Sequence, residues 1–177
     1  MEYTDTPSPP SMLLSNDEHC IVVDTEGGIV RLHPQRLNSI DPTRHPFPGK
    51  ITEATIVGAN LLVATWVERE LSLARIAAID LRDPLVDGPE LLDLRSAAEN
   101  GRLNSFQVSG SIWSHVLDAE PLAICSMDGD IVFATHHRGV YRVAPDATEL
   151  WRLKLLEWES LSNLPDGDVI AQLIASN

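Results

Sequence analysis

Residues 28–34 read Gly-Ile-Val-Arg-Leu-His-Pro, and residues 139–145 read Gly-Val-Tyr-Arg-Val-Ala-Pro. Glycine, arginine and proline hold the same places in both copies, and most of the other places are apolar in both. The β-branched and aromatic residues between them are typical of strands. The copies start 111 residues apart, which is three units of 37. Self-similarity at such a spacing predicts a protein built from structural repeats.

Other segments repeat with a similar period. Residues 20–25 match residues 130–135, and a related segment at 60–65 ends 40 residues after the first. Residues 165–170 repeat residues 127–132 at an offset of 38. Each repeat reads as a meander of short strands joined by polar turns, and Asp128-Gly129 is a strong hairpin signal.

The pattern predicts an all-β protein, a β-propeller-type array of about four small antiparallel sheets. We read residues 91–95 and 103–108 as strand candidates, residues 151–155 as a fourth strand, and find helix signals weak throughout. Residues 1–11 are a flexible, polar, proline-rich start. The rest, 12–177, forms a single domain whose units span about 12–48, 50–86, 88–118, 120–158 and, in part, 159–177.

Residues 139–152 resemble the end of a blade in quinoprotein-like propellers, in which an aromatic strand leads into an Asp-Gly-Thr turn and then a tryptophan. Here the turn is Asp146-Ala147-Thr148 and the tryptophan is Trp151, so Ala147 stands where those propellers usually carry glycine. The resemblance covers one blade and implies the propeller superfamily, without a specific family. The other units lack the tryptophan, so cofactor binding does not carry over and we expect no cofactor.

The number of units raises the question of closure, because a closed propeller typically takes about four to eight blades. Either four units close a ring, or the chain is a partial propeller that another chain completes. An open array leaves strand edges and apolar faces without a neighbour, which favours pairing with another chain. We therefore expect a protein partner or a homodimer, and a piece of a larger propeller is the remaining possibility.

Composition excludes several classes of partner. The chain has 177 residues, of which 26 are acidic and 13 basic, for a formal charge of -13. Such a surface repels phosphate backbones and anionic lipids, so we expect no nucleic acid and no membrane partner. No apolar run reaches the length of a membrane span, and no signal peptide is recognisable, so we expect a cytoplasmic location. Cys20 and Cys125 show no metal-binding spacing.

Few residues stand out as candidate sites. His136 and His137 are adjacent after a strand, where they would need a loop conformation to share a ligand, and we expect no metal there. Trp66 and Trp113 are candidates for a binding platform, although tryptophans at repeated positions often pack between blades. No catalytic residue is recognisable.

These features favour a non-catalytic protein-interaction or scaffold module that associates with itself, because loops on a rigid scaffold commonly carry recognition. The alternative is a propeller-type hydrolase or oxidoreductase with an acidic pocket at the ring axis, with or without a divalent cation. The fold class does not decide between them.

Overall fold

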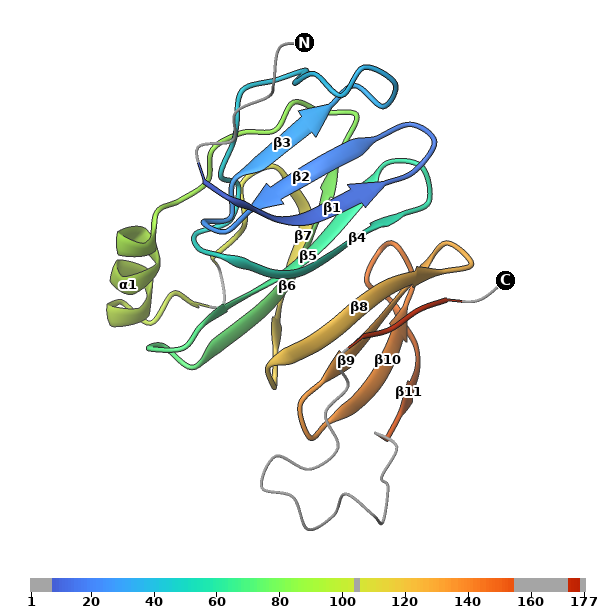
Figure 1. Cartoon of the computed structure of the whole chain (residues 1–177). Coiled ribbons are helices and arrows are strands. Elements are labelled where there is room, and N and C mark those ends of the chain that lie inside the picture. The colour runs from blue at the N-terminus through green and yellow to red at the C-terminus, as the bar shows by residue number, and fades with distance from the viewer. Residues whose placement is uncertain (1–7, 104–105, 155–171, 176–177) are drawn as a thin grey trace.

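The computed structural model describes residues 8–103, 106–154 and 172–175. These residues form eleven strands and one helix, arranged as three antiparallel sheets (Figure 1). Within the described part, the predicted array of small antiparallel sheets is confirmed. The strands are β1 (Pro10–Ser15), β2 (Cys20–Asp24), β3 (Ile29–Leu32), β4 (Ile51–Val57), β5 (Leu61–Glu68), β6 (Leu73–Asp80), β7 (Ser111–Leu117), β8 (Pro121–Met127), β9 (Asp130–Thr135), β10 (Gly139–Val143) and β11 (Glu149–Leu153); the helix is α1 (Leu91–Glu99).

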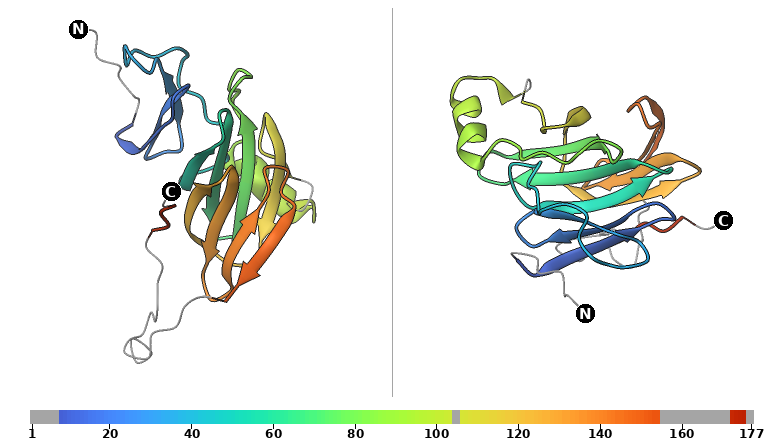
Figure 2. Two further views of the ribbon diagram at one scale, coloured as in Figure 1. Left: turned by 90° about the vertical axis from the view of Figure 1, so that its right-hand side faces the viewer. Right: turned by 90° about the horizontal axis from the view of Figure 1, so that it is seen from above.

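Each sheet is a meander whose strands follow one another along the chain. Sheet 1 has the order β1-β2-β3, sheet 2 the order β4-β5-β6-β7, and sheet 3 the order β8-β9-β10-β11. The first strands lie at the inner side of the array, where β4 contacts both β1 and β8. Figure 2 shows the three sheets following one another as successive layers, with sheet 2 in the middle. This is the stacking of propeller blades.

Two apolar cores hold the layers together. Leu62, Ala64 and Trp66 of β5 pack toward sheet 1, against residues such as Ile21. Val63, the alternate residue of the same strand, packs toward sheet 3. Both faces of β5 are therefore buried, which explains why its sequence is apolar at almost every place, since successive side chains on a strand point to opposite faces.

The repeated heptapeptides occupy equivalent places. Residues 29–32 form β3 and residues 139–143 form β10, each the third strand of its sheet. Both repeat arginines make an ion pair with an acid of the same unit: Arg31 with Asp41, and Arg142 with Asp130. The segment after β3 runs back along it, because Ile29 bridges to Arg44 and Leu32 to Ser39. Sheet 1 thereby gains an irregular outer segment in place of a fourth strand.

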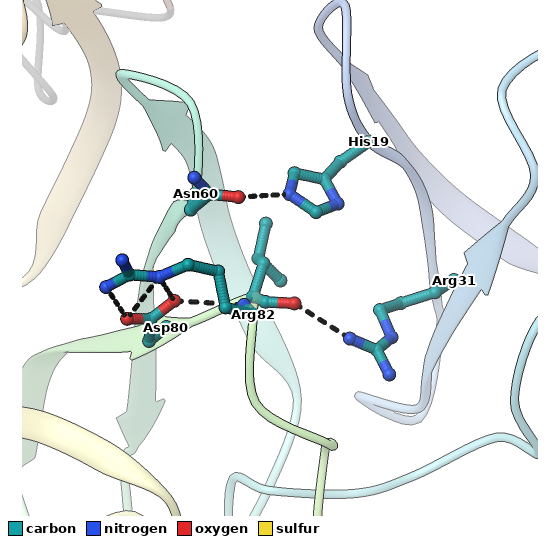
Figure 3. Close-up of polar contacts among 6 residues, drawn as sticks. His19, Arg31, Asn60, Asp80 and Arg82 are labelled. Atoms are coloured by element: carbon teal, nitrogen blue, oxygen red, sulfur yellow. Dashed lines mark hydrogen bonds and ion pairs between the residues drawn. The ribbon is translucent and has the colours of Figure 1, made fainter.

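Polar contacts join sheet 1 to sheet 2 at one end of the array (Figure 3). His19 shares a hydrogen bond of 2.8 Å with Asn60, and Arg31 donates one of 2.8 Å to the carbonyl oxygen of Leu81. Beside them, the guanidinium and the backbone N–H of Arg82 donate hydrogen bonds to the carboxylate of Asp80. The first two of these bonds link sheet 1 to sheet 2.

The unit predicted over 88–118 does not form a sheet of its own. Residues 91–95, read as a strand candidate, begin α1 instead. The helix starts with a capping box, in which Glu90 and Asp93 each accept from the other's backbone N–H, and it buries Leu94. Residues 111–117 then pair with β6 as the fourth strand of sheet 2. The long connection between β6 and β7 was mistaken for a unit because it contains apolar residues and turn signals.

The fourth strand predicted at 151–155 is confirmed over 151–153, which belong to β11; residue 154 is not in a strand, and residue 155 lies outside the described residues. The partial unit predicted over 159–177 lies outside the described residues except for 172–175, which belong to neither a helix nor a strand. In the described part of the chain, no helix is both long and apolar enough to cross a membrane.

Candidate functional site

A cleft of about 280 Å³ opens between sheets 2 and 3, near their outer strands β7 and β11. It lies to one side of the inner strands, away from the ring axis at which the sequence alternative placed an acidic pocket. Its walls come from both sheets and from the turn between β10 and β11. The lining residues are Ile76, Trp113, His115, Val116, Leu117, Asp118, Phe133, Thr135, Tyr141, Val143, Ala147, Glu149 and Arg152.

Aromatic rings form both walls. On β7, Trp113 and His115 are alternate residues on the same face, and their rings stack with centroids 5.4 Å apart. On sheet 3, Phe133 and Tyr141 are directly paired across β9 and β10, and their rings are nearly parallel with centroids 5.0 Å apart. Offset stacking of this kind is a favourable arrangement for aromatic side chains. The cleft therefore presents two stacked pairs, one from each sheet.

A cation completes the wall of sheet 3. Arg152 is the β11 partner of Tyr141, and its guanidinium carbon lies 5.2 Å from the centre of the tyrosine ring. The pKa of Arg152 is raised above its ordinary value, mainly by the Tyr141 hydroxyl and to a lesser extent by the carboxylate of Glu149. The Oε1 atom of Glu149 lies 3.8 Å from the Nε atom of Arg152. Asp118 and Glu149 are both exposed and lie at the rim. The rim is therefore charged, and the walls are aromatic and aliphatic.

A buried hydroxyl lies against the cleft. Thr135, the last residue of β9, has a side chain with no exposed surface, and its Oγ1 has no hydrogen-bond partner among the described residues. A buried polar group left without a partner costs about 1–3 kcal/mol of stability.

A hydrogen bond joins the two walls of the cleft. The indole Nε1 of Trp113 donates to the carbonyl oxygen of Pro145, 2.8 Å away, and so ties β7 to the turn that precedes β11. Pro145 is the last residue of the second heptapeptide. The second heptapeptide thus supplies Tyr141, which lines the cleft, and Pro145, which accepts the hydrogen bond from Trp113.

The four predicted site residues lie in different surroundings. Trp113 lines the cleft, whereas Trp66 is 1% exposed and packs in the core between sheets 1 and 2. His136 and His137 are in the turn after β9, with ring centroids 3.7 Å apart and a left-handed φ of 57° at His137. The structure brings the two histidines together and leaves them outside the cleft lining. Among the described residues, no group of three His, Cys, Asp or Glu side chains is placed to hold a metal ion.

Sequence reasoning missed four residues of the cleft: His115, Thr135, Tyr141 and Arg152. Two of them carried a signal, because Tyr141 belongs to the repeated heptapeptide and Arg152 to the blade ending. The spacing of Trp113 and His115, two apart on a strand, also indicates a shared face. Which strands of the two sheets meet depends on long-range pairing that no local spacing shows.

No protein-family model and no curated protein matches the chain. Among solved structures it is similar to the WD40 domain of Neurospora crassa Pan2, at 11% identity and a TM-score of 0.50 over 82% of this chain and 36% of that one. It is equally similar to the RRP9 WD40 repeats, at 11% identity and a TM-score of 0.50 over 84% of this chain and 43% of that one.

The chain therefore spans less than half the length of these two structures. The likeness shows the fold: the sheets of this chain are arranged like blades of a β-propeller, and the chain corresponds to part of such a fold. The Trp-Asp dipeptide that names WD repeats is absent from the sequence, so the two share an architecture without that signature.

Proposed function

We propose that this protein is a non-catalytic protein-interaction module that associates with a second copy of itself. The observation that carries the proposal is the number of sheets, since the described residues form three and a closed propeller typically needs about four to eight. Three sheets stack as an arc with two terminal blades. Two such arcs joined end to end would contain six blades, which is within the usual range.

The outward face of each terminal sheet carries an exposed leucine. On sheet 1, Leu13 of β1 pairs with Val22, on the face opposite the core shared with sheet 2, and it is 69% exposed. On sheet 3, Leu153 of β11 pairs with Val140, on the face opposite Tyr141, and it is 60% exposed. Blades in a propeller bury such positions against the next blade.

The two faces are suited to a self-complementary closure. If the outward face of sheet 1 packs on that of sheet 3 in a second copy, a twofold axis makes the same contact again at the other junction. The formal charge of -13 opposes association of two copies, so dimerisation should strengthen as salt screens the repulsion. A neutral or basic partner chain of similar shape would fit the same two faces.

The test is the mass of the particle in solution, by size-exclusion chromatography with light scattering. We expect twice the chain mass of 19.5 kDa, and we expect Leu13→Glu and Leu153→Glu each to give a monomer. Leu92→Glu is the matched control, because Leu92 lies on α1 with the same 69% exposure as Leu13 and should leave the dimer intact. A wild-type monomer at all salt concentrations would reject self-association.

The hydrolase or oxidoreductase alternative gains no support from the described residues. The cleft combines aromatic walls with a charged rim, and its polar groups suit recognition. We therefore place no reaction there.

A further inference from the structure

We propose that Arg142 of sheet 3 donates a hydrogen bond to the carbonyl oxygen of Pro34 in a second copy of the chain. The inference rests on the proposed self-association and names the polar contact that aligns the two copies. It follows from a hydrogen bond that recurs at both junctions between sheets, and from one donor and one acceptor that are left over at the two ends of the array.

The junction between sheets 1 and 2 shows the pattern. Arg31 lies on the face of sheet 1 that meets sheet 2, because it pairs with Ile21 of the shared core. Its Nε and Nη2 atoms bond to Asp41 of the same unit. Its Nη1 atom crosses to sheet 2 and donates to the carbonyl oxygen of Leu81, 2.8 Å away (Figure 3). Leu81 is the first residue after β6, the third strand of sheet 2.

The junction between sheets 2 and 3 uses an acceptor at the corresponding place. Trp113 of sheet 2 donates from Nε1 to the carbonyl oxygen of Pro145. Pro145 is the second residue after β10, the third strand of sheet 3. At both junctions, therefore, a side chain of one sheet donates to a carbonyl oxygen just beyond the third strand of the sheet that follows.

Arg142 is the donor left over at the end of the array. It holds the same place in the second heptapeptide as Arg31 in the first, and it lies on the outward face of sheet 3, opposite Tyr141. Its Nε and Nη2 atoms lie 2.7 and 2.6 Å from Oδ2 of Asp130, while its Nη1 atom has no partner among the described residues. Arg142 is therefore held by an acid of its own unit as Arg31 is, with the crossing donor unused.

Pro34 is the acceptor left over at the start of the array. It ends the first heptapeptide, as Pro145 ends the second, and it is the second residue after β3, the third strand of sheet 1. In the described part of the chain no donor reaches its carbonyl oxygen, and the residue is only partly buried. No described sheet precedes sheet 1, which explains why this acceptor has no donor.

A second copy brings the two groups together. In the proposed closure, sheet 3 of one copy is followed by sheet 1 of the other, so Arg142 meets the chain just beyond β3. A hydrogen bond from a guanidinium is charge-assisted and is roughly twice as strong as one between neutral groups. The acceptor is a neutral carbonyl, so two acidic copies can form this bond without a basic partner. A twofold axis repeats it, which gives two such bonds in each dimer.

The first experiment measures the dimer dissociation constant of the full chain by sedimentation equilibrium. Arg142→Lys keeps a positive charge beside Asp130 but removes the planar fork that can hold the acid and also donate across the junction. We expect the dissociation constant to rise about tenfold or more, because each dimer loses two charge-assisted bonds. Arg138→Lys is the matched control, since Arg138 forms an exposed pair with Asp118 and the constant should stay within about twofold.

The second experiment follows the carbonyl ¹³C signals of Pro34 and Pro145 by NMR. We expect the Pro34 signal of the wild-type dimer to differ from that of monomeric Leu13→Glu. The Pro145 signal is the control and should stay in place, because its bond from Trp113 lies within one chain. Arg142→Lys, concentrated until it dimerises, should show the Pro34 signal of the monomer. A mere loosening of sheet 3 would not produce that result.

The outcomes separate the two proposals. A wild-type monomer at all salt concentrations rejects self-association and this contact with it. A wild-type dimer whose dissociation constant is unchanged in Arg142→Lys overturns the contact and leaves self-association standing. The same holds if the Pro34 signal is equal in dimer and monomer, or if the Pro145 signal moves as much as the Pro34 signal.

Discussion

The indole nitrogen of Trp113 donates a hydrogen bond to the carbonyl oxygen of Pro145 over 2.8 Å. This bond crosses from sheet 2 to sheet 3, whereas most hydrogen bonds in such a fold stay within one sheet. It links β7 to the turn before β11, and so joins the two sheets that supply the aromatic walls of the cleft. The sequence predicts Trp113 as a binding residue, and in the structure Trp113 also connects sheets 2 and 3.

Replacing Trp113 by phenylalanine removes the bond and keeps an aromatic ring in the wall. We expect Trp113→Phe to lower the free energy of unfolding by about 0.5–1.5 kcal/mol, the usual net value of one hydrogen bond, as measured by urea denaturation. Trp151→Phe is the control, because Trp151 pairs with Arg142 on the opposite face of sheet 3 and lines no part of the cleft. An unchanged midpoint for Trp113→Phe would mean that the bond does not stabilise the junction.

Ala147 occupies a backbone conformation that favours glycine. Its φ is 69°, in the left-handed region, within the turn that Ala144 closes with Thr148. A non-glycine residue in this conformation is strained by roughly 1–2 kcal/mol. Glycine relieves this strain, but its unfolded chain has more conformational entropy, and this offsets part of the gain in stability. We expect Ala147→Gly to raise the free energy of unfolding by about 0.5–1 kcal/mol in urea denaturation.

The control for Ala147→Gly is Ala59→Gly, in the turn between β4 and β5, where φ is not left-handed. For this control we expect the free energy of unfolding to fall by about 0.4–1 kcal/mol, because glycine relieves no strain there and only raises the entropy of the unfolded chain. A destabilised Ala147→Gly variant would contradict the strain argument.

The sequence resemblance already indicates this strained place. Residues 139–152 resemble a blade ending in which glycine usually stands at the position of Ala147, and the structure shows why glycine suits it. The repeated heptapeptides were equally informative, because a glycine, an alternating strand and a proline turn are local features. Each can be recognised from neighbours in the chain alone.

The parts that sequence reasoning missed depend on distant contacts. Residues 111–117 join sheet 2 only by pairing with β6, more than thirty residues earlier, across a connection that contains α1. Register across such a distance is set by burial of whole faces, which a single segment does not display. The cleft follows from the same pairing, so Trp113 could be named as a candidate but its partners could not.

Arg75 of β6 holds the connection before β7 onto sheet 2. It is fully buried, and its guanidinium donates to the carbonyl oxygens of Phe106 and Leu103 and to the hydroxyl of Ser114. Burial lowers the pKa of Arg75 from its ordinary value, yet the group stays charged at neutral pH. Its bonds are therefore charge-assisted.

We expect Arg75→Met to lower the free energy of unfolding by about 3 kcal/mol, because two part-buried carbonyl groups and the Ser114 hydroxyl lose a charged donor. Hydrogen exchange should also speed up at the amide of Phe106, which donates to Leu103 in the same connection. Arg95→Met is the control, since the Arg95–Glu70 pair is exposed and should contribute less than about 1 kcal/mol. Equal losses for the two variants would contradict an anchoring role for Arg75.

Asp80 and Arg82 give a prediction on titration. The Arg82 side chain, and after it the Arg82 backbone N–H, lower the pKa of the Asp80 carboxyl to about 2. Because the folded pKa is depressed, the stability that this pair contributes is present at neutral pH and is lost as the pH falls through about 2. The pair is exposed, so salt should reduce its contribution.

Arg82→Gln removes the larger cause and keeps the backbone donor. We expect the pKa of Asp80, followed by the chemical shift of its side-chain carboxyl carbon, to rise toward the ordinary value of about 3.9 without reaching it. The contribution of this pair to stability should then be smaller than in the wild type, and its loss on acidification should be complete at a higher pH. The His19–Asn60 bond at the same junction is independent of Arg82, so its signals should stay in place in the variant at neutral pH. An unchanged Asp80 titration would show that the ion pair seen here does not persist in solution.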